Sequence, residues 1–167
     1  MSERLRPKDR WGRSVLCDDA RVTELLGRAP AKLVDLPQLR ITLVHAVNNN
    51  QWFVVCALCS VIGELMFAAL DVSGKSDMFP KLDALRLPAK KQGSKHKRRN
   101  HRRNEAYLPL AALRHTCFHP AMSAPIRDLP RDVFVAMASL HTDAAADWAL
   151  EQLERALCFE LEIARDE

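Results

Sequence analysis

The sequence predicts an all-α protein, a compact helical bundle of four to five helices. Leucine and alanine together make up 45 of the 167 residues, whereas aromatic residues account for only 6%, and this composition favours helices over sheets. Apolar residues also recur at three- and four-residue steps in several segments. The five glycines are too dispersed to form the phosphate-binding loops of dinucleotide- and ATP-binding folds. The length fits one domain with a substantial core.

The positive charge of the chain is concentrated in one segment. The formal net charge is +4, but residues 90–103 contain eight Lys and Arg and no acidic residue, which leaves 17 basic against 21 acidic residues elsewhere. The body of the protein is therefore mildly acidic. Because the basic run lacks apolar periodicity and its charges repel one another, we predict a mobile basic insertion at 88–105 within the bundle.

The first third of the chain is expected to form a short helix and then a longer helical segment. Residues 1–35 are interpreted as an N-terminal arm with a helix over residues 19–26, and residues 36–165 as the helical bundle. Asp35 is a possible helix cap and Pro37 suits a first helical turn. The core of the domain is therefore expected to begin at about residue 36.

The longest apolar run, Trp52–Leu70, predicts a helix that is buried on nearly all sides at the centre of the bundle. Its length would also cross a bilayer, but Glu64 within it and the lack of a flanking charge pattern disfavour a membrane span. Asparagines at 48–50 mark a weak point before the run, so we expect one long helix or two nearly collinear ones. Cys56 and Cys59 form a C-x-x-C that we interpret as small core side chains, because neither an exposed helix start nor a second ligand pair is evident.

The second half of the chain contains three further helical patterns. A short helix is expected over residues 78–87. Residues 107–118 form another, which ends before Pro120 because a residue that precedes proline is displaced from the α region. The pattern returns at Asp132 and continues into an amphipathic terminal helix. The acidic outer face of that helix carries Asp147, Glu151 and Glu154.

The cysteines indicate a reducing environment. There are five of them, an odd number, and they are scattered along the chain. The N-terminal residues are polar and charged, unlike a secretory signal. We therefore expect reduced thiols and a cytoplasmic location.

The stretch from Leu113 to Pro120 carries the candidate chemistry. It contains an Arg-x4-His pair, Arg114 and His119, with a polar residue after the arginine, an aromatic residue before the histidine and a proline after it. A second pair of the same spacing, Arg40 and His45, lacks this context. The surroundings, more than the spacing, single out the later pair.

These residues resemble the signature of the HEPN superfamily, which is an arginine, a polar residue, three to five further residues and a histidine. RHTCFH, Arg114 to His119, is similar to the shortest form of it, with His115 in the polar slot. The resemblance implies a compact bundle of four or five helices and a metal-independent endoribonuclease of the kind found in toxin–antitoxin, phage-defence and RNA-processing settings. It also implies a homodimer in which two motifs form a composite active site, while some members of the superfamily only bind.

The chemistry of RNA cleavage fits these residue types. RNA supplies its own nucleophile, the 2′-OH, so cleavage needs a proton-transfer group and a cation for the phosphorane and no cofactor. We expect His119 to transfer protons, Arg114 to bind phosphate and His115 to assist as a helper on the face of His119. Glu64 is the candidate partner of Arg114, because an acid inside an apolar helix is costly unless it is paired.

The basic run is the candidate RNA-binding segment, because it would bind polyanions by releasing counterions, without sequence preference. We expect RNA and, with the superfamily resemblance, an antitoxin protein as partners. The residues expected to contact RNA are Lys95, Lys97, Arg98, Arg99, Arg102 and Arg103.

Three alternatives remain open at this point. The protein could be a non-catalytic helical module that binds nucleic acid or a partner protein through the basic run. His115 and His119, with Cys117 between them, have the spacing of metal ligands, although a zinc site needs a third and usually a fourth; we predict no metal. Finally, Arg114 and His119 could simply be a surface arginine and a capped helix end.

Overall fold

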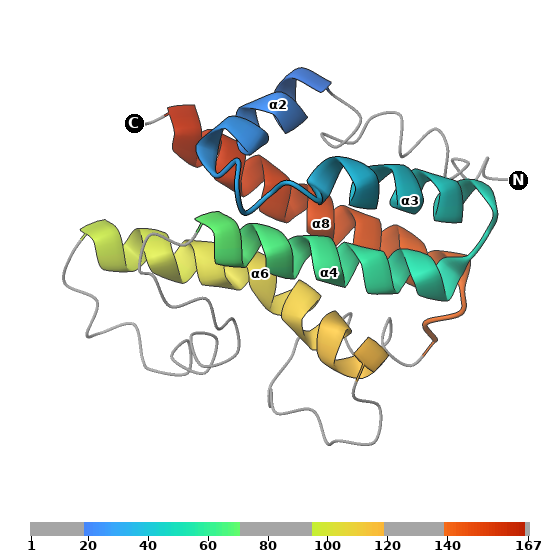
Figure 1. Cartoon of the computed structure of the whole chain (residues 1–167). Coiled ribbons are helices and arrows are strands. Elements are labelled where there is room, and N and C mark those ends of the chain that lie inside the picture. The colour runs from blue at the N-terminus through green and yellow to red at the C-terminus, as the bar shows by residue number, and fades with distance from the viewer. Residues whose placement is uncertain (1–18, 71–94, 119–138, 166–167) are drawn as a thin grey trace, which may run out of the picture.

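The computed structural model describes residues 19–70, 95–118 and 139–165, which form five helices and no strand (Figure 1). This confirms the all-α prediction. The predicted helix over residues 78–87 and the helical start predicted at Asp132 lie outside the described residues. The helices are α2 (Asp19–Arg28), α3 (Leu36–Asn48), α4 (Trp52–Leu70), α6 (Lys95–Phe118) and α8 (Asp143–Arg165).

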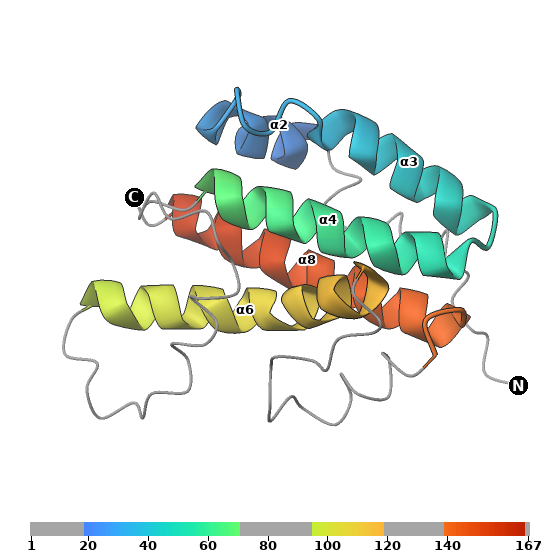
Figure 2. The same ribbon diagram turned by 60° about the horizontal axis from the view of Figure 1, so that its bottom comes forward.

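Helix α4 lies at the centre of the bundle and packs against α3, α6 and α8 (Figure 2). Its bounds are those expected from the apolar run. By length and composition α4 is the one helix among the described residues that could cross a membrane, and half of its most apolar window is buried in the bundle. A soluble core helix meets the same criterion. The positions of α4 that pack into the core are Val55, Cys56, Cys59, Ser60, Ile62, Gly63, Met66 and Phe67.

Helices α3 and α4 form an antiparallel hairpin (Figure 1), so the expectation of one long or two collinear helices is wrong. The chain reverses at Asn50, which has a positive φ of 55°. The N–H of Asn50 donates to the Val47 carbonyl and that of Gln51 to the Ala46 carbonyl, the pattern of a Schellman helix end. Asparagine tolerates this left-handed conformation better than most residues, so the triplet reverses the chain.

Helix α6 corrects the predicted mobile insertion at 88–105. From Lys95 onward these residues are helical and continuous with the segment predicted at 107–118. The prediction weighed the repulsion between charges but not the packing of Arg103 and Tyr107, which are both buried in the bundle. Pro109 lies inside α6 and removes one backbone hydrogen bond, and the helix bends along its length in Figure 1.

A glycine sets the spacing between α4 and α6. A Cβ atom added to Gly63 would lie 2.7 Å from Cδ1 and 3.2 Å from Cβ of Leu110. Such distances are below ordinary van der Waals contact, so only glycine allows this approach without a shift. The close contact brings this turn of α4, which also carries Glu64, against α6.

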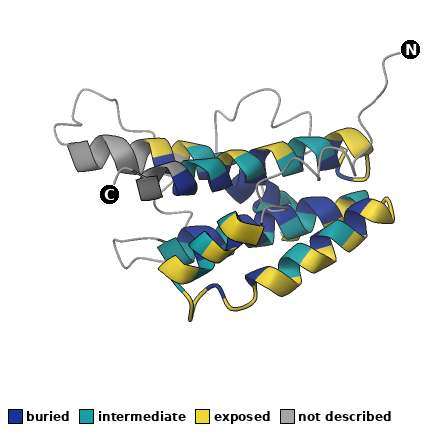
Figure 3. Cartoon of the chain, turned by 90° about the horizontal axis from the view of Figure 1, so that it is seen from above, coloured by how far each residue is buried: buried dark blue, intermediate teal, exposed yellow. Residues whose placement is uncertain are grey.

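Helix α8 is amphipathic, as predicted. Thr142 precedes it and its hydroxyl accepts a hydrogen bond from the Ala145 N–H at 3.2 Å, as an N-cap residue does. Buried residues lie on the sides of the helices that face one another (Figure 3), whereas Glu151 is exposed. The buried positions of α8 are Ala145, Ala146, Ala149, Gln152, Leu153, Ala156, Leu157, Glu160 and Leu161.

Candidate functional site

An ion pair between Glu64 of α4 and Arg114 of α6 forms the candidate site. The Nε atom of Arg114 pairs with Oε2 of Glu64, which confirms the predicted partnership. The side chain of Arg114 is 29% exposed and that of Glu64 is 36% exposed, so the pair lies at the rim of the α4–α6 interface instead of inside the core. Arg114 has further N–H donors besides Nε, and its side chain is partly exposed.

The aromatic side chain of Phe118 lies beside this ion pair. The guanidinium carbon of Arg114 is 6.0 Å from the centroid of the Phe118 ring, at the outer limit of a cation–π contact. Phe118 itself is half exposed and is the last residue of α6. The arginine is therefore held between a carboxylate on one helix and a ring on its own helix.

The two histidines of the motif differ in what the structure describes. His115 is only 8% exposed, because adjacent helical residues point about 100° apart and Arg114 takes the outward direction. The structure does not bring His115 to the exposed rim, so it does not fit a helper that contacts substrate directly. His119 lies outside the described residues, which reach Phe118 in α6.

The second Arg-x4-His pair has a structural role for its arginine. The Nη1 atom of Arg40 is 2.6 Å from Oδ1 of Asp19, which ties α3 to the start of α2. His45 is exposed, and its carbonyl accepts hydrogen bonds from Asn49 at the end of α3. Thus only the pair at Arg114 has an acidic partner on the central helix.

The candidate RNA-binding residues separate into two groups. Lys95, Lys97, Arg98 and Arg99 belong to the first turns of α6, and Arg102 is exposed. Arg103, in contrast, is only 7% exposed and pairs with Glu160. The prediction that Arg103 contacts RNA is therefore wrong for this fold, because a buried and paired guanidinium does not reach a phosphate.

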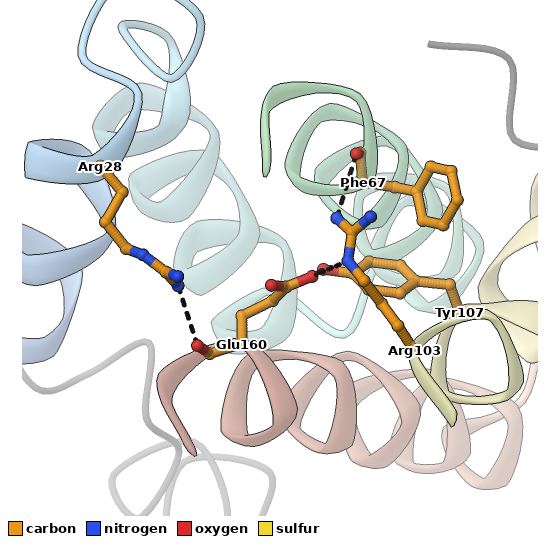
Figure 4. Close-up of polar contacts among 5 residues, drawn as sticks. All are labelled: Arg28, Phe67, Arg103, Tyr107 and Glu160. Atoms are coloured by element: carbon orange, nitrogen blue, oxygen red, sulfur yellow. Dashed lines mark hydrogen bonds and ion pairs between the residues drawn. The ribbon is translucent and has the colours of Figure 1, made fainter. Parts of the chain in front are cut away.

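A buried polar cluster, called the Glu160 cluster below, joins four helices (Figure 4). Oε1 of Glu160 accepts hydrogen bonds from Arg103 Nε at 2.6 Å and from the Tyr107 hydroxyl at 2.8 Å. Arg103 Nη2 also donates to the Phe67 carbonyl at 3.2 Å, and Arg28 Nη1 donates to the Glu160 carbonyl at 2.8 Å. Burial, followed by the charge of Glu160, raises the pKa of the Tyr107 hydroxyl well above its usual value.

Sequence reasoning missed this cluster. The available signal was Glu160 itself, which lies between Leu157 and Leu161 on the apolar side of α8. A buried carboxylate requires a cation or several donors, and Glu160 is such a carboxylate. Its partner Arg103 belongs to a run of similar residues, so the sequence does not single it out.

Three thiols lie close together where α4 packs on α6. Burial raises the pKa of Cys56 to about 12 and that of Cys117 to about 11, and the pKa of Cys59 is raised well above its usual value; neighbouring thiols add to the shifts of Cys56 and Cys59. Cys56 Sγ donates to the Leu140 carbonyl at 3.8 Å. Across the described residues, no three His, Cys, Asp or Glu side chains form a metal site. The C-x-x-C therefore has the core position expected of it.

Alkylation of these thiols is expected to be slow in the folded protein. At about pH 8 a thiol with a pKa near 12 is ionised roughly 1,000-fold less, and one near 11 roughly 100-fold less, than a free cysteine. Because the pKa is raised, the rate should increase as the pH rises from about 9 towards 12. Mass spectrometry after timed iodoacetamide treatment, with urea-unfolded protein as the control, measures the modification of each cysteine. Equal rates for Cys56 in folded and unfolded protein would contradict its burial.

Comparison of the chain with protein-family models, with curated proteins and with solved structures finds no match in any of the three. The case for a function therefore depends on the residues of this chain and on the arrangement of its helices.

Proposed function

We propose that this protein is a metal-independent endoribonuclease of HEPN type that cleaves RNA by attack of the 2′-OH on the adjacent phosphate. The single observation that carries the proposal is the ion pair between Arg114 and Glu64 at an exposed rim. A chance Arg-x4-His pair has no need of an acidic partner from the central helix. Here the arginine of the motif is held in place and remains partly accessible.

The proposed mechanism assigns one task to each residue. Arg114 binds the scissile phosphate through the guanidinium edge that Glu64 does not occupy and stabilises the negative charge of the phosphorane. His119 exchanges protons with the 2′-OH or with the leaving 5′ oxygen. Glu64 is a positioning residue, because it fixes the rotamer of Arg114 and lowers the entropy lost when phosphate binds. His115, which is buried, acts only through its neighbours.

The functional setting is part of the proposal. In an ideal helix, residues five apart, such as Arg114 and His119, point about 140° from each other. A twofold homodimer that combines Arg114 of one copy with His119 of the other would overcome this divergence. We propose such a composite site, a cytoplasmic location, and control by an antitoxin protein or a role in phage defence.

The test is cleavage of RNA by the purified protein in excess EDTA. Wild type is expected to produce fragments with 2′,3′-cyclic phosphate ends, because the 2′-OH is the nucleophile. The variant His119→Ala is expected to lose about 10²–10⁴ in rate, because a general acid or base is removed, and Arg114→Ala about 10²–10³, because a donor to the phosphorane is removed. Arg40→Ala, which disrupts the other Arg-x4-His pair, is the matched control and should cleave normally.

Three results would contradict the proposal. Absence of cleavage by wild type across structured and unstructured RNAs would leave a binding role for the basic half of α6. Equal cleavage by wild type and both motif variants would identify a contaminating nuclease. A rate abolished by EDTA would also contradict it, because the proposed chemistry uses no metal.

A further inference from the structure

We infer that the basic first half of α6 binds the RNA backbone at a fixed distance from Arg114. This distance sets a minimum length for an RNA that is bound tightly. The inference rests on the proposed function for the role of Arg114. It goes further because it assigns the basic run a fixed geometry and the substrate a size.

The helical part of the basic run and Arg114 belong to one helix. Helix α6 extends from Lys95 to Phe118 without interruption and follows a single path in both Figure 1 and Figure 2. A basic loop would place its charges at many distances from the ion pair. A helix holds each backbone position at a single distance from that pair.

The Glu160 cluster fixes this helix to the bundle at the end of the basic run. Arg103, directly after the exposed Arg102, is held by Glu160 of α8 and by the Phe67 carbonyl of α4. Its guanidinium carbon also lies 4.7 Å from the centre of the Phe67 ring. One turn later Tyr107 binds the same carboxylate. Two successive turns of α6 are thus anchored to other helices (Figure 4).

The anchor also explains why one arginine of the run is buried. The eight basic positions of residues 90–103 would carry the same charge with Lys or Arg at each of them, yet Arg103 gives up phosphate contact to pair with Glu160. Its planar guanidinium satisfies a carboxylate, a carbonyl and an aromatic ring at once, which a lysine does not do. The pairing holds the turn of Arg103 in the bundle, and the basic turns before it continue the same helix.

The length of α6 between the basic turns and Arg114 corresponds to a number of nucleotides. With a rise of about 1.5 Å per residue, Arg99 and Lys95 lie roughly 22 and 28 Å from Arg114 along the helix. A stacked RNA strand advances about 3.4 Å per nucleotide. An RNA that contacts Arg114 and the basic half together therefore needs about seven to eight stacked nucleotides. Shorter RNAs reach at most Arg102, about 18 Å from Arg114 along the helix, and lack the contacts with the turns of Lys95 and Arg99.

Binding of uncleavable RNA tests the inference independently of catalysis. Fluorescence anisotropy is measured with labelled 2′-O-methyl oligouridylates of about 3 to 12 nucleotides, which have no 2′-OH to attack phosphate. We expect the affinity to rise about tenfold or more in one step near seven to eight nucleotides. Cleavage of natural RNA is measured in parallel. Step-like binding without cleavage would disprove the proposed ribonuclease and leave the inferred length requirement standing.

The decisive variant is Asn100→Pro, with Asn100→Ala as its matched control. Proline breaks the helix between the basic turns and the anchor and leaves every charge in place. We expect Asn100→Pro to lose the step, with long RNAs bound about tenfold more weakly and short ones unchanged, and Asn100→Ala to keep it. Arg99→Glu should also weaken only the long RNAs.

The inference is overturned by a smooth rise of wild-type affinity with length, by a step that survives in Asn100→Pro, or by no RNA binding at all. Thermal melting curves of wild type and Asn100→Pro, measured by circular dichroism, show whether Asn100→Pro still folds. If it does not, the length series with Arg99→Glu decides, because that change lies outside the anchored turns.

Discussion

Replacement of Glu160 by alanine is expected to lower the free energy of unfolding by about 3–5 kcal/mol, the usual effect of removing one partner from a buried ion pair. The carboxylate is 2% exposed and accepts hydrogen bonds from both Arg103 and Tyr107. Without it, Nε of Arg103 and the Tyr107 hydroxyl lose the buried acceptor that they share. In thermal denaturation the melting temperature should fall by about 6–20 °C.

Three controls isolate the buried pair. Glu151→Ala changes the same residue type on the exposed side of α8 and should alter stability by less than about 0.5 kcal/mol. Tyr107→Phe should cost about 1 kcal/mol, because one hydrogen bond is lost. The double variant Arg103→Met with Glu160→Leu should recover much of the loss, since apolar side chains can replace a buried pair. A Glu160→Ala protein as stable as wild type would show that α6 is not anchored there.

Replacement of Arg114 by alanine is expected to lower the rate of RNA cleavage by about 10²–10³, the loss seen when one donor to a developing oxyanion is removed. This follows from the proposed role of Arg114 in binding the phosphorane. Arg114→Lys should recover only part of the activity, because lysine keeps the charge but cannot bind Glu64 and phosphate through separate edges. Initial rates on a fluorogenic RNA, measured over a range of substrate concentrations, give kcat and KM for each variant.

Changes at Glu64 separate positioning from stability. Glu64→Gln should keep the fold, because the side chain is 36% exposed, and should lower activity by about tenfold through a weaker, neutral hydrogen bond to Arg114. Glu64→Asp should be less active than wild type, since the shorter chain holds Arg114 less well. If Glu64→Gln and wild type have equal kcat and KM, Glu64 does not position the arginine.

Local periodicity accounts for what the sequence predicted well. The apolar run coincides with the described span of α4, Trp52–Leu70, but only half of its most apolar window is buried, and Phe53 and Val54 are exposed. Glu64 pairs with Arg114, fifty residues away, as expected, although the carboxylate is partly exposed and not buried. Helix α6 is described as far as Phe118, two residues before Pro120.

Chain direction and charge partners could not be predicted in the same way. The expectation of collinear helices failed because the reversal depends on one left-handed residue, Asn50, and on which helical faces pack together. The basic run was assigned as mobile because its own residues repel one another. The compensating contact comes from Glu160, which lies 57 residues after Arg103.

By itself, the sequence determined the helical class, the central position of α4 and the pairing of Glu64 with an arginine, because each depends on local periodicity or on the cost of an unpaired carboxylate in an apolar helix. Only the tertiary structure decided that Arg103 belongs to the core, that His115 is buried and that the basic run continues the helix of Arg114. The physical reason is that neighbouring arginines in a run are chemically identical. The packing of α6 against α4 and α8 selects which one meets a carboxylate and which ones face solvent.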